Sequence, residues 1–343
     1  MNSSLQTIRQ KRIAVFKANK RGYYSAWIFI FLFIFTLFSE FIANDKPLLV
    51  SYNNEFYTPI FYEYSEVTFG GEFESEADYK DEYVQELIRE DGYIIWPLIR
   101  YSYDTIKTDS ELSFPSAPDG ANLLGTDDQG RDVFSRLMYG FRISVLFGLT
   151  LTIFSSIIGV IVGATQGYYG GKVDLLGQRF IEIWGGLPTL FLLLILVNYI
   201  QPTFWWLLGL LLLFSWTSLV GVVRAEFLRA RNFEYVKAAR ALGQSDKNII
   251  IKHILPNALI STMTFMPFVL TGSITTLTSL DFLGFGLPAG SPSLGELLAQ
   301  GKANLHAPWL GISAFMVLSV LLTLLIFVGE AFRDALDPRI AQK

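Results

Sequence analysis

Six continuous apolar runs, each close to the length that crosses a bilayer as a helix, constrain this chain more than any other feature of its sequence. Within a hydrocarbon layer the protein itself must satisfy every backbone polar group, which admits only helices and closed barrels. Barrel strands alternate apolar and polar side chains, whereas these runs do not. The sequence therefore predicts an all-α integral membrane protein with six transmembrane helices, over residues 23–43, 143–164, 183–200, 204–223, 260–280 and 309–328.

The charges around these runs predict an orientation. Residues 1–22 carry six Lys or Arg and no acid, and residues 224–252 carry seven Lys or Arg against three acids. Short basic flanks stay in the cytoplasm, and their side chains also contact anionic lipid headgroups, which fits residues 1–22 better than binding to nucleic acid. Both termini are therefore expected to be cytoplasmic. The first run is interpreted as a retained anchor, because it exceeds the length of a signal-peptide core.

Residues 44–120 separate the first run from the second and are expected to lie outside the cytoplasm. This insertion holds 17 acids against five Lys or Arg, yet it is too rich in aromatic residues for a disordered acidic linker. It is predicted to fold as a small subdomain with strands within residues 52–64 and one short helix over residues 79–89. Its acidic surface fits either plain solvation or docking of a partner, and the sequence leaves both open.

The residue combinations that carry catalysis are missing. There is no cysteine, and the two histidines, His253 and His306, fall in segments expected on opposite sides of the membrane. Neither a metal centre nor a Ser-His-Asp set is therefore expected. The Gly-rich run QGYYGGKVD has Val173 where a phosphate loop needs Ser or Thr after its Lys. The sequence predicts a protein without a cofactor and without enzymatic activity of its own.

One charged segment, residues 224–256, interrupts the apolar sequence between the fourth and fifth runs. Glu234 is well placed to begin a short helix, because the partial positive charge of a helix N-terminus favours an acid. Lys237 and Arg240 occupy one face of that helix. The opposite face carries a narrow stripe at positions i, i+3, i+4 and i+7, formed by Tyr235, Ala238, Ala239 and Leu242.

Gly243 is predicted to end this helix, Ser245 to cap a second short helix, and Pro256 to begin the fifth run. Two roles suit a helix, a turn and a helix on the cytoplasmic face. One is an amphipathic element resting on lipid, and the other is a rigid link to a soluble partner. The residues alone favour neither role.

The same segment resembles the cytoplasmic EAA loop of ABC importer permeases, whose pattern is E-A-A, three residues, G, nine residues and I-x-L-P. Lys237 and His253 differ from the first Glu and the Ile of that pattern. The acid stands instead at Glu234, as in the EYVxAARALG form of the oligopeptide, dipeptide and nickel branch. The positions that match are Ala238, Ala239, Gly243, Leu255 and Pro256.

Three further segments, residues 123–148, 280–301 and 333–339, resemble the C-type subunit of that branch. RGYYSAWIF and the insertion after IANDKPLL look most like the Yej-type peptide importer permeases, a subfamily associated with oligopeptides and microcin C. The resemblance implies a type I importer bundle in the bacterial inner (plasma) membrane. Residues 121–343 would form a five-span core, and the insertion would lie in the periplasm.

The resemblance also implies partners: a second homologous permease subunit, a cytoplasmic ABC ATPase that binds the ATP, and a periplasmic peptide-binding protein. An ion-coupled secondary transporter or channel with the same spans is the alternative. The acids Glu40, Glu182 and Glu330 lie near the ends of apolar runs, which favours interfacial positions over proton coupling. The residues implied in ATPase coupling are Glu234, Tyr235, Ala238, Ala239, Arg240, Leu242, Gly243, Leu255 and Pro256.

Overall fold

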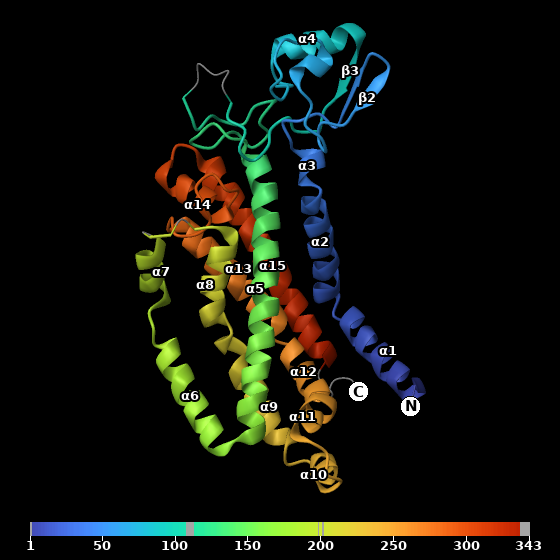
Figure 1. The fold of residues 1–343 in the computed structure, drawn as a ribbon, viewed down its shortest axis with the longest axis vertical. Helices are drawn as coiled ribbons and strands as arrows, with labels where there is room; N and C mark the ends of the chain where they lie inside the picture. The colour runs from blue at the N-terminus through green and yellow to red at the C-terminus, as the bar shows by residue number, and fades with distance from the viewer. Residues whose placement is uncertain (1, 108–112, 198, 201, 337–343) are drawn as a thin grey trace.

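The computed structural model describes residues 2–107, 113–197, 199–200 and 202–336, so small parts of the predicted insertion, third span and C-terminal ending lie outside the described residues. A bundle of long helices carries a small mixed subdomain at one end, which we call the insertion end (Figure 1). The opposite end is called the α10 end after the short helix α10 (Glu234–Ala241). The other helices of the bundle are α1 (Asn2–Ala18), α2 (Lys20–Leu37), α3 (Ser39–Ile42), α5 (Val133–Tyr169), α6 (Gly171–Gly185), α7 (Thr189–Val197), α8 (Phe204–Ser215), α9 (Thr217–Ala230), α11 (Asp246–Asn248), η2 (Ile249–Ile254), α12 (Leu255–Met263), α13 (Met266–Phe282), α14 (Leu294–Ala303) and α15 (Pro308–Leu336).

Three helical stretches of the described residues are long and apolar enough to cross a membrane: α5, α8 together with α9, and α15. The number rises to five if two bent pairs count as one span each. These pairs are α6 with α7, bent by 59°, and the helix that ends with α12 followed by α13, bent by 54°. Five of the six predicted spans fall on these helices. The first predicted span falls on α2 and α3, which are separated at Phe38 and are not among the five.

Proline divides two of the predicted spans. Pro188 lies between α6 and α7, and Pro267 lies in the first turn of α13. Because proline lacks a backbone N–H and its ring crowds the preceding turn, a helix kinks or restarts there. The second predicted span, in contrast, covers only the middle of α5, which is 37 residues long. The first turns of α5 lie before that predicted span, and they include Arg136, whose charged side chain is buried by protein.

A row of glycines lets α5 lie directly against α9. Gly159, Gly163 and Gly167 recur every four residues and therefore share one face of α5. A Cβ atom at Gly163 would stand 2.8 Å from the backbone oxygen of Val220 on α9, closer than real Cβ contacts come. The backbones of the two helices can approach this closely only where side chains are absent, as in other membrane helix pairs.

The insertion folds around a small antiparallel sheet and is not purely helical. Its strands are β1 (Leu49–Tyr52), β2 (Glu55–Tyr57) and β3 (Gly92–Ile95), in the order β2-β1-β3. Phe69, which ends the single-turn helix η1 (Glu66–Phe69), is fully buried among the rings of Tyr52, Tyr57, Tyr64 and Tyr79. The aromatic richness that argued against a linker is therefore what forms this core.

The expected elements of the insertion are present with shifted bounds. The helix predicted over residues 79–89 is α4 (Glu82–Asp91), which begins later because the Asp81 carboxylate caps it by accepting from the Tyr83 N–H at 2.9 Å. The expected strands begin before residue 52, at Leu49, and β2 ends at Tyr57. The third strand, β3, was not predicted.

Candidate functional site

The predicted helix between the fourth and fifth spans is α10, which lies at the extremity of the molecule opposite the insertion in Figure 1. It begins at Glu234, as the sequence indicates. Gly243 follows the helix with a φ of +76°, a conformation that favours glycine. The N–H of Gly243 donates to Arg240 O at 3.0 Å, and the N–H of Gln244 donates to Ala239 O at 3.2 Å. These two bonds are those of a Schellman ending.

The two faces of α10 differ from the predicted stripe. Ala239 is buried together with Val236, which the sequence interpretation left out, in a core that also contains Phe227 and Ile249. Ala238 is exposed, and so are two large side chains on the same outer face, Tyr235 at 41% and Leu242 at 82%. Ala239 therefore fixes α10 to the bundle, whereas only the other three stripe residues face outward.

Polar contacts also hold α10 against the end of α5. The Tyr168 hydroxyl donates to Asp246 Oδ1 at 2.5 Å and accepts from Arg240 Nη2 at 3.3 Å. The Arg240 guanidinium also lies 5.7 Å from the centre of the Tyr168 ring. This hydrogen bond to Tyr168 raises the pKa of Arg240 above its ordinary value. Lys237 instead pairs with Glu234 at 2.8 Å on the exposed surface.

Tyr168 was missed by the sequence interpretation. It is the penultimate residue of a predominantly apolar helix, and the only signal for it is a hydroxyl-bearing ring at the point where the chain leaves the span. Its partners Arg240 and Asp246 are distant in sequence. Only the fold brings the three together.

The predicted second helix begins after Ser245, as α11, but it is not a separate short helix, because it continues into the fifth span. Ser245 occupies the N-cap position of α11, but its side chain makes no capping hydrogen bond. From there α11, η2 and α12 run on as one helix, of which η2 is π-helical. Pro256 lies in the first turn of α12, directly after η2, where a π-helical turn accommodates a residue that cannot donate to the helix ladder. Leu255 packs against the core that holds α10.

The bundle around α10 is itself tied together. Arg224 on α9 forms a two-pronged ion pair with Asp174 on α6, with its Nη2 2.7 Å from Asp174 Oδ2. The core that buries the inner face of α10 also contains residues of α5, α9 and α12, so these four helices pack together. The face of α10 that is turned away from this core presents Tyr235, Ala238 and Leu242.

A second polar cluster stands at the insertion end. Arg136 is fully buried, and its Nη2 donates to Glu296 Oε2 at 2.8 Å and to Ser291 O at 2.9 Å. Arg131 donates to the other oxygen of the same carboxylate, Glu296 Oε1, at 3.0 Å, and to Asp127 Oδ2 from its Nε at 2.7 Å. The cluster fastens the loop before α14 to the start of α5. The segments 123–148 and 280–301, which resemble importer permeases, thus meet in space.

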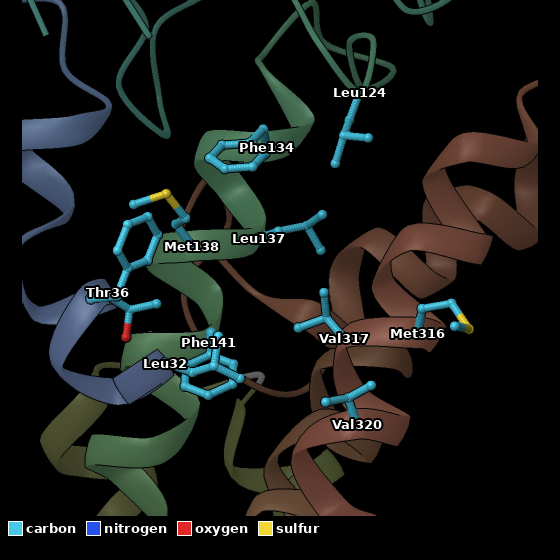
Figure 2. A pocket seen from close by; sticks show the side chains of 11 residues that line it. Leu32, Thr36, Leu124, Phe134, Leu137, Met138, Phe141, Met316, Val317 and Val320 are labelled. Carbon is cyan, nitrogen blue, oxygen red and sulfur yellow. The ribbon is translucent and has the colours of Figure 1, made fainter. Parts of the chain in front are cut away.

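An apolar cavity of about 380 Å³ lies between α2, α5 and α15 (Figure 2). Thr36, the polar residue of its wall, already donates its hydroxyl to Phe33 O at 2.9 Å. The cavity offers a peptide backbone no side-chain donor, and its only side-chain oxygen acceptor is the Thr36 hydroxyl, so it is not a candidate substrate site. Within the described residues no His, Asp and Glu group is arranged to hold a metal ion. The residues that line the cavity are Leu32, Phe35, Thr36, Leu124, Phe134, Leu137, Met138, Phe141, Met316, Val317 and Val320.

Together these features define an integral membrane protein whose apolar helices carry a firmly attached, outward-facing helix between two spans. The family model for binding-protein-dependent transport system inner membrane components matches residues 140–342, and the chain belongs to this family. It is therefore a multi-pass inner-membrane permease subunit, and ATP hydrolysis resides in a separate protein.

Relatives match the chain over most of its length. It is 59% identical over 339 residues to the inner membrane ABC transporter permease protein YejE of Escherichia coli strain K12, covering 99% of each chain. It is 56% identical over 354 residues to the peptidoglycan transport system permease protein YejE of Agrobacterium fabrum, covering 96% of this chain and 93% of the relative. The oligopeptide transport system permease protein OppC of Lactococcus lactis is 35% identical over 227 residues, 65% of this chain and 77% of its own length.

A solved structure shares the fold of the core. The MetNI methionine ABC transporter, in an inward-facing conformation, matches with a TM-score of 0.50 at 17% sequence identity. The match covers 59% of this chain and 96% of that chain. The Yej-type importer permease expected from the sequence is confirmed by these comparisons, as is the type I importer core.

Proposed function

We propose that this chain imports peptides or peptide-bearing fragments as one of two permease subunits of an ATP-driven, binding-protein-dependent transporter. The substrate class rests on relatives whose names specify peptidoglycan and oligopeptide transport. The observation that carries the mechanism is the division of α10 into a face buried in the bundle and a face that presents Tyr235, Ala238 and Leu242.

The α10 end of the bundle is assigned to the cytoplasm. Support comes from the basic residues of 1–22 and 224–252, because short segments rich in Lys and Arg stay on the cytoplasmic side of the membrane. Residues 23–43 then form a sixth span through α2 and α3, which places both termini in the cytoplasm and residues 44–120 in the periplasm. Residues 121–343 form the five-span core, with 224–256 as its coupling loop.

The outer face of α10 is the proposed contact with the cytoplasmic ABC ATPase. When ATP closes the ATPase dimer, its surface displaces α10, and the shared core moves the ends of α5, α9 and α12 with it. Leu242, Tyr235 and Ala238 make this contact, Gly243 and Arg240 hold its geometry, and Ala239 and Leu255 anchor it. Glu234 begins the helix that makes the contact, and Pro256 ends the coupling loop of residues 224–256.

A second permease subunit is proposed to cover the exposed hydroxyl face of α13. Thr275, Thr276 and Ser279 are exposed there, and each hydroxyl donates to its own helix backbone at 2.8 to 2.9 Å. Small hydroxyl residues are characteristic of contacts between membrane helices more than of surfaces that face lipid.

The insertion is proposed to contact the periplasmic binding protein. Its surface exposes Phe56 at 68% and Phe73 at 63%, large side chains that typically anchor protein contacts. A photoreactive amino acid at either position should capture the binding protein in membranes. Capture that never occurs at these positions, but does occur on the loop before α14, would contradict this assignment.

The decisive experiment measures uptake by the complete transporter in proteoliposomes. Uptake should require ATP and should survive collapse of ion gradients. Uptake that continues without nucleotide and stops with an ionophore would instead identify an ion-coupled carrier. Ion pairs account for two of the three acids near the span ends, because Glu40 pairs with Arg142 and Glu182 pairs with Arg179.

A further inference from the structure

A second apolar cleft, of about 280 Å³, opens at the α10 end of the bundle between α1, the start of α2 and the end of α15. Figure 1 shows α1 turning away from the axis of α2 beside the end of α15. The cleft is lined by Arg12, Ile13, Phe16, Lys17, Tyr23, Phe332, Ala335 and Leu336.

The walls of this cleft are held by specific contacts. Gly22 lets α2 lie directly against Ala331 of α15, where a Cβ atom on the glycine would collide with that alanine. The Asn19 side chain accepts from the Gly22 N–H at 3.2 Å and donates to Asp334 Oδ2 at 3.4 Å, which fixes the turn between α1 and α2. The rings of Phe16 and Tyr23 meet edge to face across that turn, 6.4 Å apart. The angle between α1 and α2 is therefore built into the fold.

The charges at the cleft have one sign. Arg12 and Lys17 both line the cleft, and side chains of this kind bury an aliphatic stem while they keep the charged end in water. Lys11, Lys20 and Arg21 lie close by in sequence, and residues 10–24 contain no acid. The acid nearest to the turn, Asp334, accepts a hydrogen bond from Asn19. A ligand with an apolar tail and a negatively charged head matches this arrangement.

We propose that the cleft binds one anionic phospholipid, with an acyl chain between Phe16, Tyr23 and Leu336 and the phosphate between Arg12 and Lys17. A cleft of this kind at a bilayer surface fills with an acyl chain, and cations at its mouth select negatively charged headgroups. The cavity between α2, α5 and α15 provides an internal comparison, because no charged residue lines it (Figure 2). It can hold a chain but has no means of selecting a headgroup.

The test is native mass spectrometry of the full chain in detergent, titrated with phosphatidylglycerol or with phosphatidylcholine of the same acyl chains. The unaltered chain should bind phosphatidylglycerol more tightly. R12Q/K17Q should bind it about tenfold more weakly, with binding of phosphatidylcholine unchanged. The matched control R89Q/K302Q removes one arginine and one lysine at the insertion end, away from the cleft, and should behave as the unaltered chain does. A335W, which fills the cleft without changing its charge, should weaken binding of both lipids.

Three outcomes would overturn the proposal. The first is an unchanged preference for phosphatidylglycerol in R12Q/K17Q when its melting temperature is also unchanged. The second is competition by glycerol 3-phosphate as effective as that by phosphatidylglycerol, which would indicate a site for free anions. The third is an increase of about tenfold or more in lipid binding when residues 337–343 are deleted, which would make the chain's own ending the occupant.

Discussion

The Arg142 side chain on α5 donates from a single nitrogen, Nη1, to both carboxylate oxygens of Glu40 on α3, at 2.7 and 2.8 Å. The guanidinium also lies 4.7 Å from the centre of the Tyr139 ring, and the Tyr139 hydroxyl donates to Ala43 O at 3.0 Å. Glu40 precedes the region that the family model matches, whereas Arg142 lies inside it. These contacts attach α3, at the end of the first predicted span, to the region that the family model matches.

Removing this attachment should weaken the chain measurably. Because the Glu40 side chain is 41% exposed, its pair with Arg142 is partly screened, and Glu40→Gln should cost about 1 kcal/mol of unfolding free energy. Arg142→Gln should cost a similar amount, and the double variant should cost less than the sum, since the two changes remove one interaction. Thermal unfolding in detergent measures all three. Glu182→Gln, which breaks the exposed pair with Arg179, is the matched control and should change little. Fully additive costs would show that the pair does not stabilise the fold.

The outer face of α10 can be tested separately from its inner face. Leu242 is 82% exposed and has no role in the core, so Leu242→Glu should leave the melting temperature unchanged. In the complete transporter it should lower ATP-driven uptake by about tenfold, because it places a charge in the contact with the ATPase. Lys237→Gln, an exposed change on the same helix, serves as the control. Normal uptake by Leu242→Glu in an assembled complex would remove this residue from the coupling contact.

A substitution on the inner face of α10 should lower the stability of the fold, which a substitution on the outer face should not. Ala239 is buried beside Val236, so Ala239→Asp should destabilise the chain by about 3 kcal/mol through an unpaired buried charge. Ala238→Asp introduces the same charge one residue earlier on the exposed face and should cost much less. Denaturant titration of the two variants compares them directly. Equal stabilities would mean that α10 does not pack on the bundle as described.

The turn after α10 gives a further prediction about the backbone. At Gly243, with a φ of +76°, an alanine would fit the space but would strain the backbone, costing about 1 kcal/mol. Gly243→Pro should cost more, because it also removes the N–H that donates to Arg240 O. Gly221→Ala, at a helical glycine that also has open space around it, should be neutral or slightly stabilising. Melting temperatures that fall in another order would argue against the left-handed conformation.

The two ends of α10 are set by nearby residues in the sequence, whereas its buried face is set by neighbouring helices. The start at Glu234 and the stop at Gly243 could be predicted, because helix ends depend on a few adjacent residues. The division of the stripe between Ala238 and Ala239 could not, since both residues suit either face. Which one is buried depends on where α5 and α9 lie. The role of Tyr168 was hidden for the same reason.

The positions of the apolar spans could be predicted from the sequence, but their bends could not. Apolar length located five of the helical stretches, because satisfaction of the backbone in lipid is a property of each segment alone. The prolines were visible in the sequence, but the bends of 59° and 54° depend on the neighbouring helices. The strand β3 was missed because its four residues pair with β1, which lies about 40 residues earlier in the sequence, and only the fold brings the two strands together.

The buried cluster at the insertion end gives the largest expected effect. Arg136 bridges α5 to Glu296 on α14 and to the backbone of the preceding loop at Ser291, with no exposed surface of its own. Arg136→Met should therefore cost about 3 to 5 kcal/mol, since it leaves the carboxylate of Glu296 with one cation, Arg131, and removes the arginine donor from three carbonyl oxygens, those of Tyr103, Gly290 and Ser291. Limited proteolysis should cut the loop of residues 283–293 faster in this variant, while α10 stays protected. Arg179→Met removes an arginine from an exposed pair and should leave both unfolding and proteolysis unchanged. If Arg136→Met instead unfolds at the same denaturant concentration as the unaltered chain, the loop is held by its apolar contacts and not by this cluster.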